Sequence, residues 1–385
     1  MEEISISKQP KKRKYLNEIV FLRSIACLSV AVVHSLIVAQ NKTTFTNSTS
    51  ETIVDSIFLL FTYGTPTFIF ISMLLISYSY PNGLPRDFLK RRFMLIMLPF
   101  IFMAIFYAAD MNIFNQLLAG NMTEVFSAAT WSTISSNVVG NLMGGYHGYF
   151  ILIIFQFYIL AYFFHKFLSK SNPLVIILIS LIINLVYLSI FNFMEPPTDS
   201  EAMLHFWRSG HWIPFIGWIY YFSLAFYCGL YYAQFIKILK KNKYLVIFSA
   251  VLFGALTVVL SIFELIPLSS KSVAMIFFTT AMIGVLYLIA LRIKEMPKVL
   301  VMINNYSFSI YLLNMFYINM TYTILSLLKV DFGIFNVFIF FTASTMASML
   351  TAHLLNKLAF GKYLVGRVNV AKTVSKPLAV ETRNA

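Results

Sequence analysis

The stretch NEIVFLRSIACLSVAVVHSL, residues 17–36, is apolar along almost its whole length and is long enough to cross a lipid bilayer as one helix. It nevertheless contains Arg23 and His34, two ionisable side chains that hydrocarbon disfavours. At about 100° and 1.5 Å per residue, their spacing places them within roughly 20° of one helix face and about 16 Å apart along the axis. The stretch therefore predicts a membrane helix with one polar face.

The composition of the whole chain agrees with this first segment. Of 385 residues, 59% are hydrophobic and only 11% are charged, and the mean hydropathy is +0.77. Soluble domains carry about 25% charged residues, so we expect an integral membrane protein whose main partner is the lipid bilayer. The net charge of +14 then reflects topology, and we expect no nucleic-acid binding. Cys27 and Cys228 both lie in apolar runs, so we expect no disulfide framework and no metal site.

Apolar runs recur from end to end and predict an all-α, polytopic membrane protein of about ten transmembrane helices. We place these spans at residues 17–39, 53–79, 93–109, 148–168, 172–192, 213–236, 243–264, 272–292, 300–328 and 332–356. The central domain would cover residues 17–356, between basic tails at residues 1–16 and 357–385.

The Lys and Arg residues test this count, because cytoplasmic loops collect them. With the N-terminus inside, Arg23 lies within a span, and the basic residues that fall in outer loops are Lys42, Arg208, Lys271 and Lys329. One missed or extra helix would move the basic residues of all later loops to the opposite side of the membrane, and the concentration of Lys and Arg on the cytoplasmic side would be lost. We therefore predict that both termini are cytoplasmic.

Two of the predicted outer loops, residues 110–147 and 193–212, are long enough to fold over an outward cavity. The second contains Trp207 and Trp212, which could stack on sugars, together with His205 and His211, which could hydrogen-bond to them. The alternative is that these aromatic residues belong to the belt at the membrane interface.

A cation inside a span normally faces protein or a water-filled cavity, so we take a functional role for Arg23 as the working hypothesis. The alternative is that Arg23 snorkels to the cytoplasmic interface. For His34 the alternatives are proton transfer near neutral pH and a neutral imidazole bonded to a neighbouring helix. One face thus carries a cation and a possible proton acceptor that could serve two ends of one substrate.

Several motifs carry a resemblance to a known family. EIVFLRSIACLSVAVVHSL resembles the first helix of the acyltransferase 3 family of membrane-bound acyltransferases, which has an Arg and, eleven positions on, a His. YGTPTFIFISMLLISY with Ser72, DFLKRRFMLIMLPF, GYHGYFILIIFQFYILAYFF and YSFSIYLL are similar to its later helices. Within the family, GYFILIIFQFYIL and FIGWIYYFSLAFYCGLYY are most similar to the intercellular adhesion protein C branch.

The chain also departs from the family pattern. Met73 replaces a glycine that often follows the serine at position 72, and Leu95 and Ile96 occupy the region of a further arginine. Asn314 stands where the family commonly has a histidine. Donor contacts that relatives make through that arginine are therefore not expected here, and Asn314 would either leave the role of the histidine unfilled or supply its amide as a hydrogen-bonding group.

The resemblance implies transfer of an acyl group, acetyl or succinyl, from a cytoplasmic acyl-CoA to hydroxyls of a surface polysaccharide such as poly-N-acetylglucosamine. Acyl-CoA would be a co-substrate, and no cofactor would be bound permanently. The expected location is the bacterial plasma membrane, and a polysaccharide synthase complex is a possible partner. The alternative functions are a polysaccharide exporter without acyl chemistry and an accessory subunit.

The resemblance and the charges together suggest site residues. Lys90, Arg91 and Arg92 would bind the anionic donor with Arg23, although positive-inside anchors look the same. His34 would act as the base, and His147 is a second candidate unless it is an exposed loop imidazole. Arg23 and Glu18 are further catalytic candidates, and Glu18 lies off the face of Arg23, which favours its pairing with another helix. The remaining candidates contact the acceptor or pack helices together: Ser72, Tyr146, Tyr149, Ser307, Tyr311 and Asn314.

Overall fold

The fold is a bundle of long helices. A computed structural model describes residues 16–42, 48–118, 120–197 and 200–368, and no strand occurs among them. Ten of its helical segments are long and apolar enough to cross a membrane, which confirms the predicted all-α polytopic architecture. Of the two predicted basic tails, only Leu16 and residues 357–368 lie within the described part of the chain. The domain division stays a prediction.

Five spans are built from the first half of the chain. They are α1 (Asn17–Lys42), α2 (Ser48–Phe61) with α3 (Gly64–Ser79), α4 (Phe88–Arg92) with η1 (Phe93–Met97) and α5 (Leu98–Leu118), α8 (Tyr149–Lys170) and α9 (Pro173–Phe193).

The second half supplies the other five spans. They are α10 (Glu201–Trp212) with η2 (Phe215–Trp218) and α11 (Ile219–Leu230), α13 (Lys243–Ile262), α14 (Val273–Ala290), α15 (Lys298–Leu327) and α16 (Asn336–Leu355). The shorter elements are α6 (Met122–Val125), α7 (Ala128–Leu142), α12 (Tyr232–Lys241), η3 (Gly333–Phe335) and α17 (Gly361–Leu364).

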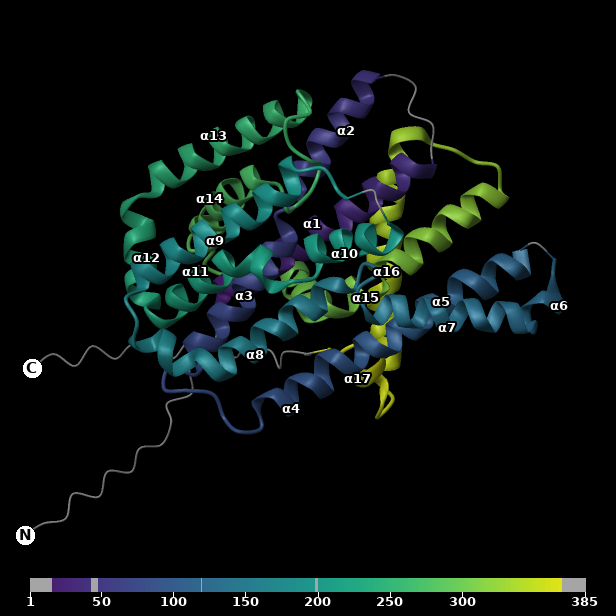
Figure 1. The fold of residues 1–385 in the computed structure, drawn as a ribbon, viewed down its shortest axis with the longest axis horizontal. Coiled ribbons are helices and arrows are strands. Elements are labelled where there is room, and N and C mark those ends of the chain that lie inside the picture. The colour runs from purple at the N-terminus through teal and green to yellow at the C-terminus, as the bar shows by residue number, and fades with distance from the viewer. Residues whose placement is uncertain (1–15, 43–47, 119, 198–199, 369–385) are drawn as a thin grey trace, which may run out of the picture.

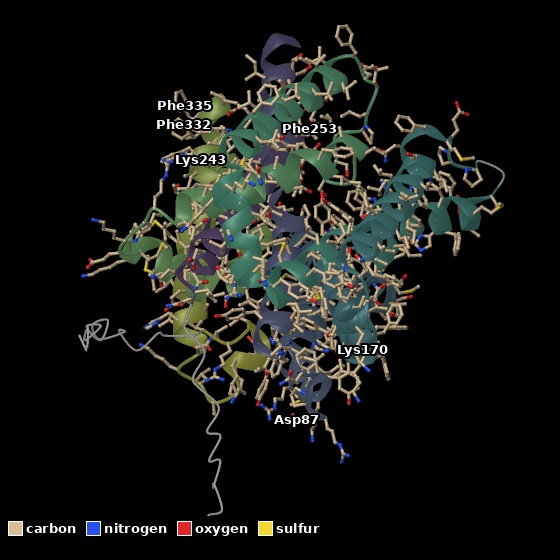
Figure 2. All side chains as sticks on the ribbon, turned by 90° about the vertical axis from the view of Figure 1, so that its left-hand side faces the viewer. Asp87, Lys170, Lys243, Phe253, Phe332 and Phe335 are labelled. Carbon is tan, nitrogen blue, oxygen red and sulfur yellow. The ribbon has the colours of Figure 1, made fainter. Side chains whose placement is uncertain are left out.

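The spans run between two ends of the bundle, which we name the basic end, where α1 begins, and the far end, where α1 finishes. In Figure 1 the turn between α12 and α13 lies at the left, on the basic end, and α6 lies at the far right. Figure 2 turns the left-hand side toward the viewer and labels Asp87, Lys170 and Lys243, which lie next to or at helix termini of the basic end.

Helix α1 occupies the centre of the bundle, where it packs against α15, α3, α16, α14 and α2. Close approach depends on small residues: a Cβ on Gly64 of α3 would lie 2.9 Å from the carbonyl oxygen of Ala26. By contrast, α9 and α13 expose most of their apolar side chains and therefore face lipid. The polar face of α1 is consequently surrounded by protein.

Both predicted outer loops, residues 110–147 and 193–212, contain helices. Residues 110–147 hold the end of α5 together with α6 and α7, and α7 packs alongside α5 (Figure 1). Residues 193–212 hold α10, whose first turn is capped by the Ser200 hydroxyl, which accepts a hydrogen bond from the Met203 amide at 3.1 Å. The helix ends just before Pro214, which has no amide hydrogen to continue it.

The third span differs from a regular helix at its basic end. The turn Phe93–Met97 is π-helical and joins α4 to α5 without a break. Such turns are rare and occur frequently at functional sites. The residue that precedes this turn is Arg92.

Candidate active site

The structure brings His34 of α1 together with Asn314 of α15. His34 Nδ1 lies 2.9 Å from Asn314 Oδ1, and Asn314 Nδ2 donates to Ser344 Oγ at 3.1 Å. Ser344 Oγ in turn donates to the carbonyl of Phe341, so the amide of Asn314 points its oxygen at the imidazole. Nδ1 therefore carries the hydrogen, and Nε2 is left with a lone pair.

His147, just before α8, lies against this pair. Its ring centroid is 5.7 Å from that of His34, and it is also enclosed by Tyr107 at 4.7 Å and Tyr146 at 5.0 Å. His147 Nε2 is buried, and no described residue hydrogen-bonds to it. Burial lowers the pKa of His147 to about 3, and the neighbouring imidazole of His34 adds to this shift.

Two tyrosines fix the backbone around the histidines. Tyr311 donates its hydroxyl hydrogen to the carbonyl of His147, which ties α15 to the start of α8. The Tyr107 hydroxyl donates to the Leu312 carbonyl at 2.9 Å and accepts from the Phe316 amide at 3.1 Å. In a regular helix the amide of Phe316 would donate directly to the carbonyl of Leu312. The Tyr107 hydroxyl bonds to both groups, so it interrupts the backbone hydrogen bonds of α15 beside Asn314.

A cavity of about 290 Å³ opens toward the basic end, and we name it the inner cavity. Three arginines, Arg23, Arg92 and Arg367, are among the residues that line it. Arg92 lies over two aromatic rings, 5.2 Å from the centroids of both Phe88 and Tyr158. The polar side chains of Ser72, Asn304, Asn305, Ser307 and Tyr311 also line this cavity.

A second cavity, of about 690 Å³, opens between α7 and α10 toward the far end, and we name it the outer groove. Its lining includes His147, Tyr146, Tyr149, His205, Arg208 and Trp212. Tyr149 and Trp212 meet edge to face with centroids 5.4 Å apart. Tyr311 lines the inner cavity and His147 the outer groove, so the bond between them belongs to a wall that separates the two spaces. His34 lies in this wall, behind His147.

Most predicted site residues therefore lie in the wall or line one of the two cavities beside it, but three do not. Glu18 lies off the inner cavity and close enough to Tyr232 and Tyr287 to interact with them electrostatically. Lys90 and Arg91 are exposed, and Arg91 forms an ion pair with Asp87. Of the predicted basic cluster, only Arg92 reaches the inner cavity. The hydroxyl of Ser307 is occupied within its own helix, where it donates to Asn304 at 2.9 Å.

A buried lysine holds α10 beside the outer groove. Lys271 is fully buried, and its ammonium donates to the carbonyl of His211 near the end of α10. The same ammonium lies 5.3 Å from the ring centroid of Trp212 and 5.1 Å from that of Trp218. Burial lowers the pKa of Lys271 well below its usual range. His211 itself stacks on Phe191 and is not among the residues that line the groove.

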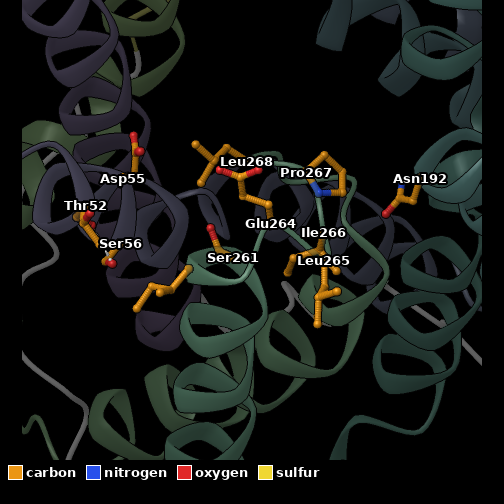
Figure 3. Close-up of a pocket in the computed structure, with 11 residues that line it drawn as sticks. Thr52, Asp55, Ser56, Asn192, Ser261, Glu264, Leu265, Ile266, Pro267 and Leu268 are labelled. Atoms are coloured by element: carbon orange, nitrogen blue, oxygen red, sulfur yellow. Dashed lines mark hydrogen bonds between the residues drawn. The ribbon is translucent and has the colours of Figure 1, made fainter. Parts of the chain in front are cut away.

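A third pocket, of about 440 Å³, lies at the far end between α2, α9 and the segment after α13. Figure 3 shows Asp55 on one side, Glu264 in the middle and Asn192 on the other side. Asp55 accepts a hydrogen bond from Gln40 at 2.6 Å. None of the histidines and tyrosines of the wall lines this pocket, so it is separate from the site around His34.

Sequence reasoning missed Tyr107, Asn304 and Arg367. Tyr107 and Asn304 lie in apolar helices where a single polar residue is common, and Arg367 was counted as one of many basic residues of a tail. No sequence signal distinguishes them, because each becomes part of the site through a contact with a distant segment.

Comparison with known proteins gives concordant matches. The family model described as "Acyltransferase domain" matches residues 16–356. The "Putative membrane-bound acyltransferase YfiQ" of Bacillus subtilis (strain 168) is 35% identical over 371 residues, which cover 96% of this chain and 99% of that relative. The "Probable poly-beta-1,6-N-acetyl-D-glucosamine export protein" of Staphylococcus aureus (strain MSSA476) is 27% identical over 307 residues, covering 78% and 82%. The Staphylococcus epidermidis protein of the same name is 26% identical over 308 residues, covering 79% and 81%. No solved structure gives a significant match.

Proposed function

We propose, from the premise that this bacterial multi-pass membrane protein belongs to the acyltransferase 3 family, that it transfers a short acyl group to a cell-surface polysaccharide. The donor is a CoA thioester bound at the basic end, and the acceptor is a glycan hydroxyl at the far end. The observation that carries this proposal is the placement of His34 and His147 in a wall between an arginine-lined cavity and an aromatic groove.

The orientation in the membrane is part of the proposal. Lys and Arg concentrate at the basic end, so the positive-inside rule puts that end in the cytoplasm, together with both termini. CoA is a cytoplasmic, phosphate-rich anion, which suits the guanidinium groups of the inner cavity. The outer groove then faces the cell surface, where polysaccharide is found. Its tyrosine and tryptophan rings can stack on sugars, and His205 and Arg208 can hydrogen-bond to them.

His34 is the proposed general base. Its Nδ1–H is held by Asn314, so Nε2 is free to take the proton from the acceptor hydroxyl as the oxygen attacks the thioester carbonyl. The C–O bond of the ester forms, the C–S bond breaks, and the proton passes to the leaving thiolate to give CoA–SH. His147, with its pKa lowered to about 3, stays uncharged at neutral pH and presents a second imidazole to the reacting groups.

The transferred group is acetyl or succinyl, and the structure favours an uncharged acyl chain. The arginines that line the inner cavity, Arg23, Arg92 and Arg367, belong to its side toward the basic end, whereas the described lining near His147 includes Tyr311 and Phe150. A carboxylate placed against that aromatic surface would lose its hydration without gaining a cation. Acetyl-CoA should therefore be used more efficiently than succinyl-CoA in membranes that contain the protein.

The alternative function is export of the polysaccharide, as the names of the staphylococcal relatives indicate for those proteins. A path for a sugar polymer would have to be continuous and polar from one end to the other. The wall formed by His34, His147, Tyr107 and Tyr311 interrupts such a path in this structure. A role as an accessory subunit of a polysaccharide synthase would leave the two cavities and the paired histidines without a purpose.

The test is the ester content of surface polysaccharide in cells that produce His34→Ala at the same protein level as the wild type. Loss of a general base should lower O-acylation by about 100-fold or more, because such groups contribute roughly 10²–10⁴ in rate. His353→Ala, which changes an exposed histidine at the basic end of α16, is the matched control and should retain acylation. Unchanged ester content in His34→Ala would refute the assignment. Polysaccharide retained inside the cell would favour export.

A further inference from the structure

The chain does not leave the bundle where the last span finishes. Residues 357–368, which we name the C-terminal strap, fold back along the basic end, where α17 packs against α5 and the π-helical turn η1. Val365 is 1% exposed, so the strap is anchored in the apolar interior. The family model ends at residue 356, so the strap lies outside the matched domain.

Asn356, the residue after α16, clamps the strap through its side chain. Its Nδ2 donates to the carbonyl of Gly366 at 3.0 Å, and its Oδ1 accepts from the amide of Val368 at 3.1 Å. Gly366 has φ +84°, and a Cβ at this position would lie 2.3 Å from the ring of Phe308. The backbone on both sides of Arg367 is therefore fixed by two hydrogen bonds and by a close contact with α15.

These contacts of Asn356 and Gly366 place Arg367 at the inner cavity. Its side chain is exposed and lines the cavity together with Arg23 of α1 and Arg92 of α4. Three arginines from segments that are far apart in the sequence thus line one cavity. Their planar forks bind phosphate oxygens in pairs, and phosphate is the chemistry to which such a cluster is best suited.

We propose that the C-terminal strap completes the donor site, with Arg367 binding phosphate groups of the CoA thioester and Asn356 acting as the residue that positions it. This inference rests on the proposed function, because it takes CoA as the donor. The phosphates of CoA lie at the other end of the pantetheine arm from the thioester. The strap correspondingly lies at the basic end of the inner cavity, whereas the wall with His34 closes the opposite end of that cavity.

The first experiment measures binding, so that it does not depend on acyl transfer. Titration calorimetry of CoA into the purified full-length protein should give a Kd about three- to tenfold higher for Arg367→Gln than for the wild type, as expected for loss of one partly exposed, charge-assisted contact. Lys362→Gln is the matched control, since Lys362 belongs to the same strap but lies over the ring of Tyr363. An unchanged Kd in Arg367→Gln would overturn the inference.

A donor without phosphates separates a phosphate contact from a general effect on the fold. S-acetyl-pantetheine should be used equally well by the wild type and Arg367→Gln, and Arg367→Lys should recover part of the affinity for CoA. Asn356→Ala should raise KM for acetyl-CoA as Arg367→Gln does, with kcat retained. An equal loss with S-acetyl-pantetheine would overturn the phosphate assignment, and an Asn356→Ala variant with normal KM would overturn the positioning role.

The phosphate of a lipid headgroup has the same chemistry, so the CoA titration is repeated in nanodiscs of phosphatidylcholine alone and with phosphatidylglycerol. The Arg367→Gln effect should be present in both. An effect seen only with the anionic lipid would overturn the inference in favour of a lipid site. If CoA binds as expected while no ester forms, the strap inference stands and the proposed reaction fails. If CoA does not bind to the wild type, the inference fails.

Discussion

At the scale of single residues, the proposed role of His34 depends on Asn314. Asn314→Ala removes the acceptor that holds Nδ1–H, so the imidazole can adopt the tautomer in which Nε2 carries the hydrogen and cannot act as a base. We expect kcat for O-acylation to fall by about tenfold or more, with little change in KM for the donor. Steady-state kinetics in isolated membranes measure both quantities.

The control for this prediction is Ser344→Ala, which keeps Asn314 but removes the hydroxyl that orients its amide. Its effect should have the same direction and be smaller. Full activity of Asn314→Ala would show that the tautomer of His34 does not depend on this contact.

His147 predicts a pH dependence of stability. Its pKa is about 3 in the folded protein against a usual value of 6.5, so the unfolded chain takes up a proton as the pH falls below about 6.5 and the folded protein does not. The stability that neutral His147 provides is therefore present above that pH and is lost progressively toward pH 3. The melting temperature of the solubilised protein should fall between pH 7 and pH 4.

His147→Gln should make this fall shallower, because the glutamine side chain does not titrate. His353→Gln, a change of an exposed histidine, should leave the slope as in the wild type. Equal slopes in the wild type and His147→Gln would mean that other groups account for the acid sensitivity.

Several residues of the site could be predicted from the sequence, but the contacts between them could not. Helical periodicity alone puts Arg23 and His34 on one face, because that relation is local to α1. The pairing of His34 with Asn314 and the intervention of Tyr107 in α15 depend on how distant spans rotate against each other. A hydropathy pattern does not encode that rotation when a helix is apolar all round.

At the scale of elements, we predict that Lys271 supports acceptor binding by fixing the position of α10. Lys271→Met removes the ammonium that caps α10 and contacts Trp212, so the α10 side of the outer groove should lose its fixed position. KM for the polysaccharide acceptor should rise several-fold, while the Kd for CoA stays the same. Overall stability should change little, since burying the ammonium carries its own cost. Acceptor titrations with washed membranes measure the change.

Lys329→Met is the control, because it changes an exposed lysine at the same end of the bundle. An acceptor KM unaffected by Lys271→Met would show that α10 keeps its position without the ammonium.

Spans could be predicted more reliably than the elements between them. A run of apolar residues long enough to cross hydrocarbon leaves little choice of structure. In residues 110–147 and 193–212 the pattern is mixed, and α7 and α10 form there through serine caps and packing on neighbouring spans. The π-helical turn was not predictable either, since its sequence FMLIM is compatible with an ordinary helix.

At the scale of the whole molecule, the proposed orientation can be tested with single cysteines. Cys27 and Cys228 are both buried, so they should react little with a membrane-impermeant maleimide and serve as a silent background. A cysteine at Glu264, exposed at the far end, should be labelled in intact cells. A cysteine at Arg86, exposed at the basic end, should be labelled only after the cells are opened. The reverse pattern would invert the proposed topology.

The count of ten spans followed from hydropathy and charge, but the two cavities did not. They arise from the way α1, α8 and α15 meet around His34, His147 and Tyr311, and each cavity is lined by segments from across the sequence. The volumes of the two cavities and the wall that separates them exist only once the helices have packed together.

The wall between the cavities has a consequence for the energetics of the cell. In the proposed reaction the acyl group leaves its bonding electron pair on the sulfur of CoA and moves outward as the formal equivalent of a cation, while the hydroxyl proton of the acceptor moves inward to that sulfur. These two movements cancel, so a turnover transfers no net charge across the membrane, and the transmembrane voltage neither drives nor opposes it. The free energy of the thioester alone would drive acylation, while the closed wall would prevent protons from leaking down the voltage between turnovers.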